Sequence, residues 1–227
     1  MNARLFVFGC SLSCLSVWPQ ILALKHNLEL VNLAVPAGDN VTQCRRFIDL
    51  FLHNKISSHD IILWEITYLN RMGFRLRPDH PFYQRANKVK HNLHTFETNL
   101  FDNERHPDYV AFNHEWYDTW YYLKNEPQTL QEIIFTLTMA NNFVQKKCLI
   151  WFAQNNLFEH DQEKIFCNLL DAHDICHLDY ETQSLMSWLH TNNLPLAADN
   201  MHPTEGVYQQ FVNTFISDHI ERFCSIK

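Results

Sequence analysis

Short apolar runs alternate along most of the chain with longer stretches whose apolar residues recur at helical spacing. The apolar runs of strand length are residues 4–9, 28–34, 60–66, 148–153 and 175–179. The stretches with helical spacing are residues 13–26, 39–54, 127–146, 160–173, 182–192 and 205–224. This alternation predicts an α/β protein with a parallel sheet of about five strands connected by crossover helices.

The alternation stops after the third predicted strand and resumes at residue 127. The segment between them, residues 68–126, is about sixty residues long. A structureless loop of that length is uncommon in a compact domain. We therefore expect residues 1–227 to form a single domain that carries a mostly helical insertion at 68–126, serving as a lid or substrate-binding cap.

Composition and charge exclude several classes of protein. Hydrophobic residues make up 46% of the chain, which is typical of a globular protein. The formal net charge is −7 and no basic run is present, so a nucleic-acid groove or a polybasic membrane patch is not expected. The apolar run Leu5–Phe8 is shorter than the roughly 7–15 residues of a signal-peptide core. No run reaches the ~18 apolar residues of a membrane span, so we expect a cytoplasmic protein without a transmembrane segment.

Two of the four glycines lie where predicted strands end. Gly9 follows the first strand and comes just before Ser11, and Gly38 follows the second strand. Because open α/β sheets bind ligands beyond the carboxyl ends of their strands, this edge of the sheet is the predicted site.

A second group of polar residues precedes the last predicted helix. Asp199 and His202 are three residues apart, and Pro203 disfavours helix at His202, so both residues are expected on a loop. Asp199 can accept a hydrogen bond from one imidazole nitrogen, which leaves the other free to take a proton from a serine. Ser11 needs such a base to become a nucleophile.

At these positions the sequence resembles the SGNH superfamily, the GDSL-type esterases and acyl hydrolases. Residues 9–12 (GCSL) stand where the family has Gly-Asp-Ser-Leu after its first strand. Gly38 matches the glycine of the second block, and residues 199–203 (DNMHP) match the last block, Asp-x-x-His-Pro. The resemblance covers most of the chain outside the insertion.

The resemblance implies a flavodoxin-like, three-layer α/β/α sandwich and a role for each matched residue. Ser11 would be the nucleophile, His202 the general base and acid, and Asp199 the residue that orients His202. The backbone N–H groups of Ser11 and Gly38 would form the oxyanion hole. No cofactor and no metal are implied.

The chain departs from the family in two blocks. The family's third block, Gly-x-Asn-Asp, supplies an Asn side chain to the oxyanion hole, but here Thr67 falls at the glycine and Asn70 lies one place late. Either Asn70 or the Thr67 hydroxyl is expected to serve instead. Cys10 replaces the Asp of the first block. A Cys10 nucleophile is disfavoured because neighbours on an extended strand end point to opposite sides.

Other patterns are weaker. The α/β-hydrolases usually carry their serine elbow in mid-chain, after several strands. The segments HNLH (91–94) and HDICH (173–177) each offer only two metal ligands, whereas zinc requires three or four. Four aromatic residues of the insertion are suited to stack on a sugar or to close over an acyl group, or else to form the insertion's own core. They are Trp116, Tyr117, Trp120 and Tyr121.

Three functions are consistent with these residues. The first is a serine esterase or acyl hydrolase that cleaves a small-molecule or saccharide ester through an acyl-enzyme. The second is an O-acetyltransferase that moves an acyl group from a donor to a sugar hydroxyl, as on a bacterial-type surface polysaccharide. The third is a non-catalytic binding module on an SGNH scaffold, suggested by Cys10 and the altered third block.

Overall fold

The central feature of the computed structural model is a five-stranded parallel sheet. The model describes residues 3–35, 38–67, 72–74, 96–98, 126–154, 162–199 and 202–226. The sheet consists of β1 (Arg4–Phe8), β2 (Glu29–Asn32), β3 (Ile61–Ile66), β6 (Cys148–Phe152) and β7 (Cys176–His177). Its strand order is β2-β1-β3-β6-β7, and every pairing is parallel, which is the flavodoxin-like arrangement. The predicted sheet is therefore confirmed.

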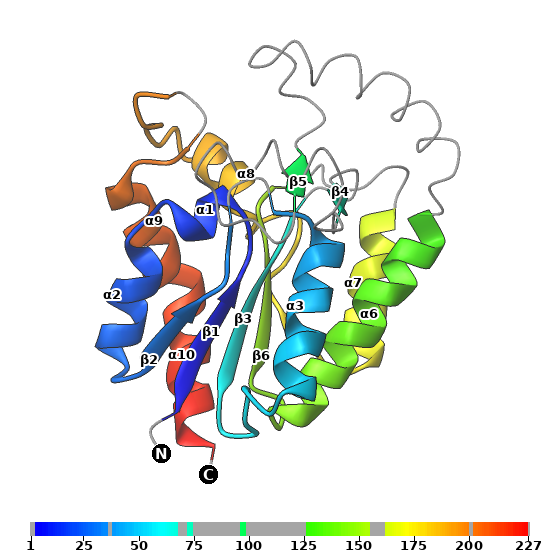
Figure 1. The fold of residues 1–227 in the computed structure, drawn as a ribbon. Coiled ribbons are helices and arrows are strands. Elements are labelled where there is room, and N and C mark those ends of the chain that lie inside the picture. The colour runs from blue at the N-terminus through cyan, green and yellow to red at the C-terminus, as the bar shows by residue number, and fades with distance from the viewer. Residues whose placement is uncertain are drawn as a thin grey trace, which may run out of the picture.

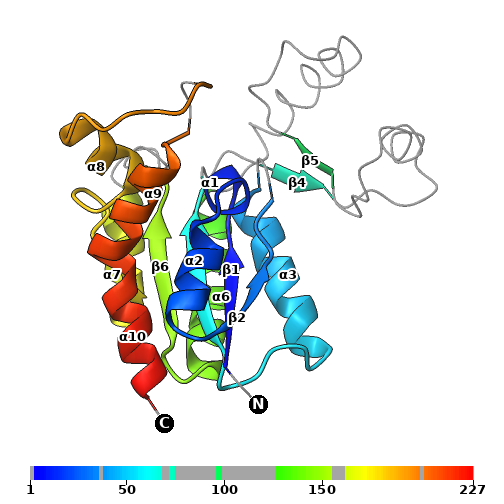
Figure 2. The same ribbon diagram turned by 90° about the vertical axis from the view of Figure 1, so that its left-hand side faces the viewer.

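Helices cover both faces of the sheet, as the predicted three-layer sandwich requires (Figure 1). One face carries α2 (Trp18–Lys25), α9 (Glu205–Phe211) and α10 (Ser217–Ser225), the last two joined through the π-helical turn η1 (Val212–Ile216). The other face carries α3 (Asn40–Leu52), α6 (Glu126–Phe143) and α7 (Gln162–Ala172). Two short helices, α1 (Ser11–Cys14) and α8 (Leu185–Thr191), lie near the carboxyl ends of the strands (Figure 2).

The position of each strand in the sheet explains why some strands are continuous apolar runs in the sequence. Every residue of β3 and β6 is buried, because both strands lie inside the sheet and are covered on both faces. The edge strand β2 is only partly buried.

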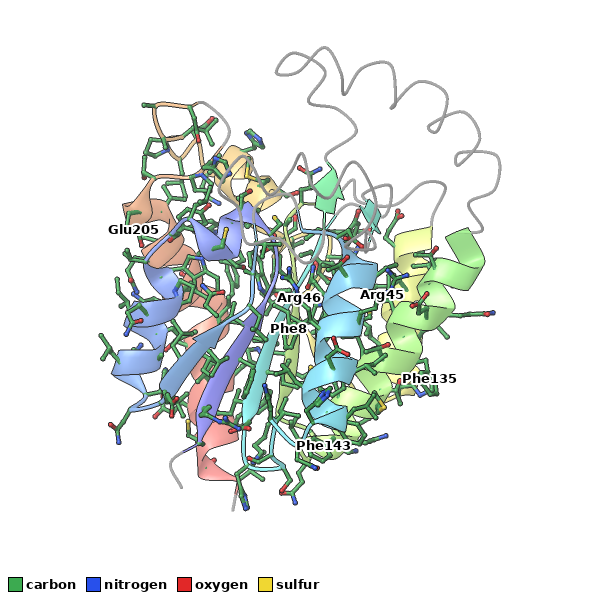
Figure 3. The ribbon with its side chains drawn as sticks, in the orientation of Figure 1. Phe8, Arg45, Arg46, Phe135, Phe143 and Glu205 are labelled. Atoms are coloured by element: carbon green, nitrogen blue, oxygen red, sulfur yellow. The ribbon has the colours of Figure 1, made fainter. Side chains whose placement is uncertain are left out.

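Aromatic side chains fill the space between the sheet and both helical layers. On one face, Phe8 of β1 stacks on Trp64 of β3 with ring centroids 4.5 Å apart, and Phe47 of α3 packs against both rings. On the other face, Trp18 of α2 meets Trp151 of β6 edge-on at 5.8 Å. The helices α3 and α6 also contact each other through Phe51 and Phe143, of which Phe143 is labelled in Figure 3. Such pairs add about 0.5–1.5 kcal/mol each beyond the area that they bury.

The helix predicted over 13–26 is divided into α1 and α2. The break follows from Pro19, because a proline ring inside a helix clashes with the carbonyl group four residues earlier. That carbonyl belongs to Leu15, the C-cap residue just after α1. Pro19 is instead accommodated in the first turn of α2, where a missing N–H is tolerated.

In the segment 68–126, the structure describes one antiparallel strand pair and the first residue of α6. The pair consists of β4 (Met72–Phe74) and β5 (Phe96–Thr98), and the sequence pattern did not predict it. The rest of the predicted helical insertion lies outside the described residues. Among the helices of the described part, none is long and apolar enough to cross a bilayer.

Candidate active site

Ser11 stands at a sharp turn between β1 and α1. Cys10 still has an extended backbone, and Ser11 is the first residue of α1. The turn lies at the carboxyl end of β1, beside the point between β1 and β3 where the strand order reverses. This is the point at which open α/β sheets bind their ligands.

Asp199 and His202 lie on a loop that is closed by backbone hydrogen bonds. Leu196 pairs with Pro203 as an isolated antiparallel bridge, and the N–H of Ala197 donates to the carbonyl of His202 over 2.7 Å. The bridge folds the chain back just before α9. It therefore brings His202 to the same end of the sheet as Ser11.

Three side chains form a continuous chain of hydrogen bonds. Nε2 of His202 lies 2.9 Å from Oγ of Ser11, and Nδ1 of His202 lies 2.5 Å from Oδ2 of Asp199. The other carboxylate oxygen of Asp199 accepts the backbone N–H of His202 over 3.0 Å. Because a carboxylate can only accept, Nδ1 carries the ring hydrogen and Nε2 accepts from the Ser11 hydroxyl. This arrangement can transfer the serine proton to His202.

The backbone N–H of Ser11 lies in the first turn of α1. Donors in a first turn have no partner within their own helix, so this N–H is suited to bind an anion beside the Ser11 hydroxyl. It is the first of the two backbone donors expected for the oxyanion hole.

The loop that carries Gly38 is held by buried polar groups. The Gly38 N–H donates to the carbonyl of Val35 over 3.0 Å, so an oxyanion would share this donor. The Thr67 hydroxyl is fully buried and donates to the Gly38 carbonyl over 3.0 Å. Asn40 hydrogen-bonds both backbone groups of Thr67, at 2.8 and 3.0 Å. Thr67 therefore fastens the Gly38 loop, and its hydroxyl hydrogen is not directed to Ser11.

Several predicted site residues lie outside the described part of the chain. They are Asn70, the second possible side-chain donor, and the aromatic residues Trp116, Tyr117, Trp120 and Tyr121. The same holds for the HNLH segment at 91–94. Among the residues that the structure does describe, no group of three metal-ligating side chains is present.

One residue of the site was missed by the sequence analysis. Glu65 of β3 is 0% exposed and lies beneath the turn that carries Ser11. Its Oε2 accepts the backbone N–H of Cys10 over 3.0 Å and the hydroxyl of Ser13 over 2.5 Å. A single carboxylate within the apolar run "IILWEI" was the available signal, because an ionisable group buried on both sides of a sheet needs partners.

None of the seven cysteines forms a disulfide bond in the part of the chain that the structure describes. The Cys10 thiol is 2% exposed and hydrogen-bonds Oε1 of Glu65, and its sulfur also lies 3.9 Å from Oγ of Ser11. The two side chains are therefore neighbours and do not point to opposite sides as expected, and His202 meets Oγ of Ser11. Burial raises the pKa of the Cys44 thiol to about 12, as expected of a core residue.

Comparison with known proteins gives a likeness of fold. No protein-family model matches the chain, and no curated protein matches its sequence. Among solved structures, the psychrotrophic esterase EstA from Pseudoalteromonas sp. has a TM-score of 0.53 at 9% identity, with 97% of this chain and 100% of that chain covered. TesA has a TM-score of 0.50 at 10% identity, with 98% of each chain covered.

A third similar structure is the protein YXIM from Bacillus subtilis, with a TM-score of 0.53 at 12% identity. All of this chain is covered, but it spans only 58% of the length of that protein. The sheet order, the helical layers and these similarities agree with one another. The chain has the fold of the SGNH/GDSL-type hydrolases that its sequence resembles.

Proposed function

We propose that the protein is a serine esterase or acyl hydrolase that acts through an acyl-enzyme on Ser11. The observation that carries the proposal is the hydrogen-bond chain from Ser11 through His202 to Asp199, at 2.9 and 2.5 Å. A serine with this partner has a general base in place, and the base has a carboxylate that orients it. The fold shared with EstA, which is named an esterase, agrees with this chemistry.

In the proposed reaction, Oγ of Ser11 attacks the carbonyl carbon of the ester while Nε2 of His202 takes the hydroxyl proton. The bond to the alcohol then breaks, and His202 returns the proton to the leaving oxygen. Water attacks the acyl-enzyme, again with His202 as the base. The acid is released as the proton returns to Oγ of Ser11.

The negative charge that develops on the carbonyl oxygen needs hydrogen-bond donors. The backbone N–H groups of Ser11 and Gly38 are the proposed donors, with the Asn70 side chain as the proposed third. Each such donor typically contributes about 100- to 1000-fold in rate. Thr67 would contribute indirectly, through its hydrogen bond to the Gly38 carbonyl.

The test is the substitution Ser11→Ala, with hydrolysis of a short-chain chromogenic ester and labelling by a fluorophosphonate as readouts. The wild-type protein should be labelled on Ser11, and Ser11→Ala should lose both labelling and turnover while keeping its thermal midpoint. Ser225→Ala, at the end of α10, is the matched control and should behave as wild type. Unchanged turnover in Ser11→Ala contradicts the proposal.

The same acyl-enzyme could be consumed by a sugar hydroxyl instead of water, as in an O-acetyltransferase. The two reactions differ only in the acceptor, so product analysis with an acetyl donor and a saccharide acceptor separates them. Acetylated saccharide as the main product would assign the transferase. Absence of fluorophosphonate labelling in the folded wild-type protein would instead assign a binding module.

A further inference from the structure

Glu65 is a carboxylate in the interior of the protein, near the middle of the sheet. It lies in β3 between Trp64 and Ile66, and all three residues are 0% exposed. In the register of the sheet it stands beside Trp151 of β6, which is also buried. Burying a carboxylate among such neighbours is costly unless hydrogen-bond donors surround it.

The donors that surround Glu65 come from the turn that carries Ser11. Cys10 supplies its backbone N–H and its thiol, and Ser13 supplies its hydroxyl. These two residues flank Ser11 on either side. The carboxylate therefore reaches these three donors only when residues 10–13 adopt the turn that is observed.

Gly9 gives independent evidence that this contact is tight. A Cβ atom added to Gly9 would lie 2.3 Å from Oε2 of Glu65, 2.7 Å from Oγ of Ser13 and 2.9 Å from Cβ of Glu65. The Glu65 Cβ atom belongs to the rigid base of the side chain, so it cannot move away without moving β3. Glycine at position 9 is thus what allows Glu65 to lie under the turn.

Glu65 also lies close to the helix that follows His202. Burial raises the pKa of the Tyr208 phenol of α9, and the charges of Glu65 and Cys10 raise it further. The carboxylate therefore contacts the turn that presents Ser11 and lies near the helix that follows His202.

We propose that Glu65 is a positioning residue that holds the turn of residues 10–13 in the geometry in which Ser11 meets His202. The proposal rests on the esterase function proposed above. It assigns Glu65 no contact with the substrate. It predicts that loss of the carboxylate lowers kcat more than it alters KM, because the substrate site remains while the attacking oxygen is displaced.

The test compares Glu65→Met with Glu65→Gln. Methionine has a similar volume but leaves the Cys10 N–H and the Ser13 hydroxyl without an acceptor. Because a misplacement of about 1 Å can cost 100-fold in rate, kcat of Glu65→Met should fall by roughly 10- to 100-fold, with little change in KM. In Glu65→Gln, the amide oxygen can occupy the place of Oε2 and accept both hydrogen bonds, so kcat should be largely restored.

Asp60 supplies the matched control, because it is a buried carboxylate that immediately precedes β3, at the end of the strand opposite to Glu65. Asp60→Asn should lower the thermal midpoint without changing kcat, which separates a loss of stability from a loss of positioning. A folded Glu65→Met with the kcat of wild type overturns the inference. So does a Glu65→Gln that is as impaired as Glu65→Met.

If Glu65→Met does not give folded protein, Ser13→Ala decides the question. It removes one of the two hydrogen bonds to Oε2, and kcat should fall by less than in Glu65→Met while KM stays constant. A kcat equal to that of wild type overturns the inference. Fluorophosphonate labelling of the wild-type protein is measured in the same series. If the wild-type protein is not labelled, both the proposed function and the positioning role are contradicted. If it is labelled but the variants have the kcat of wild type, only the positioning role is contradicted.

Discussion

Gly38 lies against the carbonyl oxygen of Gly9. A Cβ atom on Gly38 would be 2.7 Å from that oxygen and 3.0 Å from the carbonyl oxygen of Val35. Both obstacles are backbone atoms, so neither can give way by changing a rotamer. Neither glycine has a positive φ angle. The requirement is therefore space: the loops after β1 and β2 pack backbone against backbone beside Ser11.

Gly38→Ala should disturb this contact and with it the candidate oxyanion hole. Overpacking of a buried site typically costs about 1–3 kcal/mol of stability. If the Gly38 N–H also binds the oxyanion, its displacement should lower kcat by roughly 100-fold or more. Thermal unfolding and ester hydrolysis measure the two effects separately.

Gly206→Ala is the control for Gly38→Ala. A Cβ atom at Gly206, in the first turn of α9, meets no atom within 4 Å. Alanine is preferred over glycine in helices by about 1 kcal/mol, so this variant should be as stable as wild type or more so, and fully active. Equal kcat in both variants would mean that the Gly9–Gly38 contact has no part in the reaction.

Asp199→Asn should lower kcat strongly. An asparagine can offer its amide hydrogens to Nδ1 of His202, which favours the ring form that has its hydrogen on Nε2 and cannot accept from Ser11. The corresponding change in serine proteases lowers kcat by about 10,000-fold. Because the Asp199 side chain is partly exposed, kcat should fall less here, by roughly 100-fold or more but by less than 10,000-fold. Steady-state kinetics measure it, and a loss below threefold would show that Asp199 does not orient His202.

Glu205→Ala should reduce activity through a contact between distant parts of the chain. Oε2 of Glu205, at the start of α9 (Figure 3), accepts the Ser16 hydroxyl over 2.9 Å and the Val17 N–H over 3.3 Å. The contact is exposed, so its loss should cost less than about 1 kcal/mol of stability. The contact nevertheless connects the segment after α1 to the helix that follows His202. Because its loss should loosen the alignment of Ser11 with His202, kcat should fall by about three- to tenfold.

The control for Glu205→Ala is Glu163→Ala. Glu163 lies in the first turn of α7, so its removal also deletes a negative charge that is favourable at a helix N-terminus. It should cost a similar amount of stability and leave kcat unchanged. Equal losses of kcat in the two variants would attribute the effect to the helix charge and not to the contact with Ser16.

Asp60 should make the stability of the protein depend on pH. Burial raises the pKa of its carboxyl group, but hydrogen bonds from the Arg4 guanidinium and from the N–H groups of Ser57 and Arg4 outweigh burial and lower it. A carboxyl whose pKa is lower in the folded than in the unfolded state stabilises the fold at pH values above its unfolded-state pKa of about 4. This stabilisation is lost as the pH falls through the folded-state pKa.

Denaturant titrations of wild type and Asp60→Asn at several pH values test this expectation. At pH 7 the variant should be less stable by about 1–3 kcal/mol, because hydrogen bonds to a charged group are lost. The difference should shrink below pH 4. A difference that stays constant down to pH 3 would show that the ionised carboxylate is not its source.

The elements of the sheet could be predicted because their residues carry strong local signals. Buried strands such as β3 and β6 are nearly continuous apolar runs, and Gly9 and Gly38 mark the points where strands end. The sequence also predicted Ser11 at the carboxyl edge of the sheet, and it linked Asp199 and His202 to Ser11 because a serine nucleophile needs an oriented base. The structure brings these three side chains within hydrogen-bond distance.

The contacts between side chains of different elements could not be predicted. Glu65 meets Cys10 and Ser13 only because the register of β3 against β1 sets it at the height of the turn, and the sequence does not encode that register locally. Thr67 was considered as an oxyanion donor, yet its hydroxyl is used on the Gly38 carbonyl. The strand pair β4–β5 is short and lacks the alternating pattern by which strands are recognised.

The hydrogen bond between Ser11 and His202 joins residues separated by 191 positions. During synthesis, the serine therefore leaves the ribosome long before its base does. Until α9 docks onto the sheet beside α2, Ser11 has no partner to accept its proton and is no more reactive than an ordinary alcohol. In the proposed reaction, the Ser11 hydroxyl therefore gains its base only after nearly the whole chain has been made and the segment that carries His202 has packed against the turn after β1.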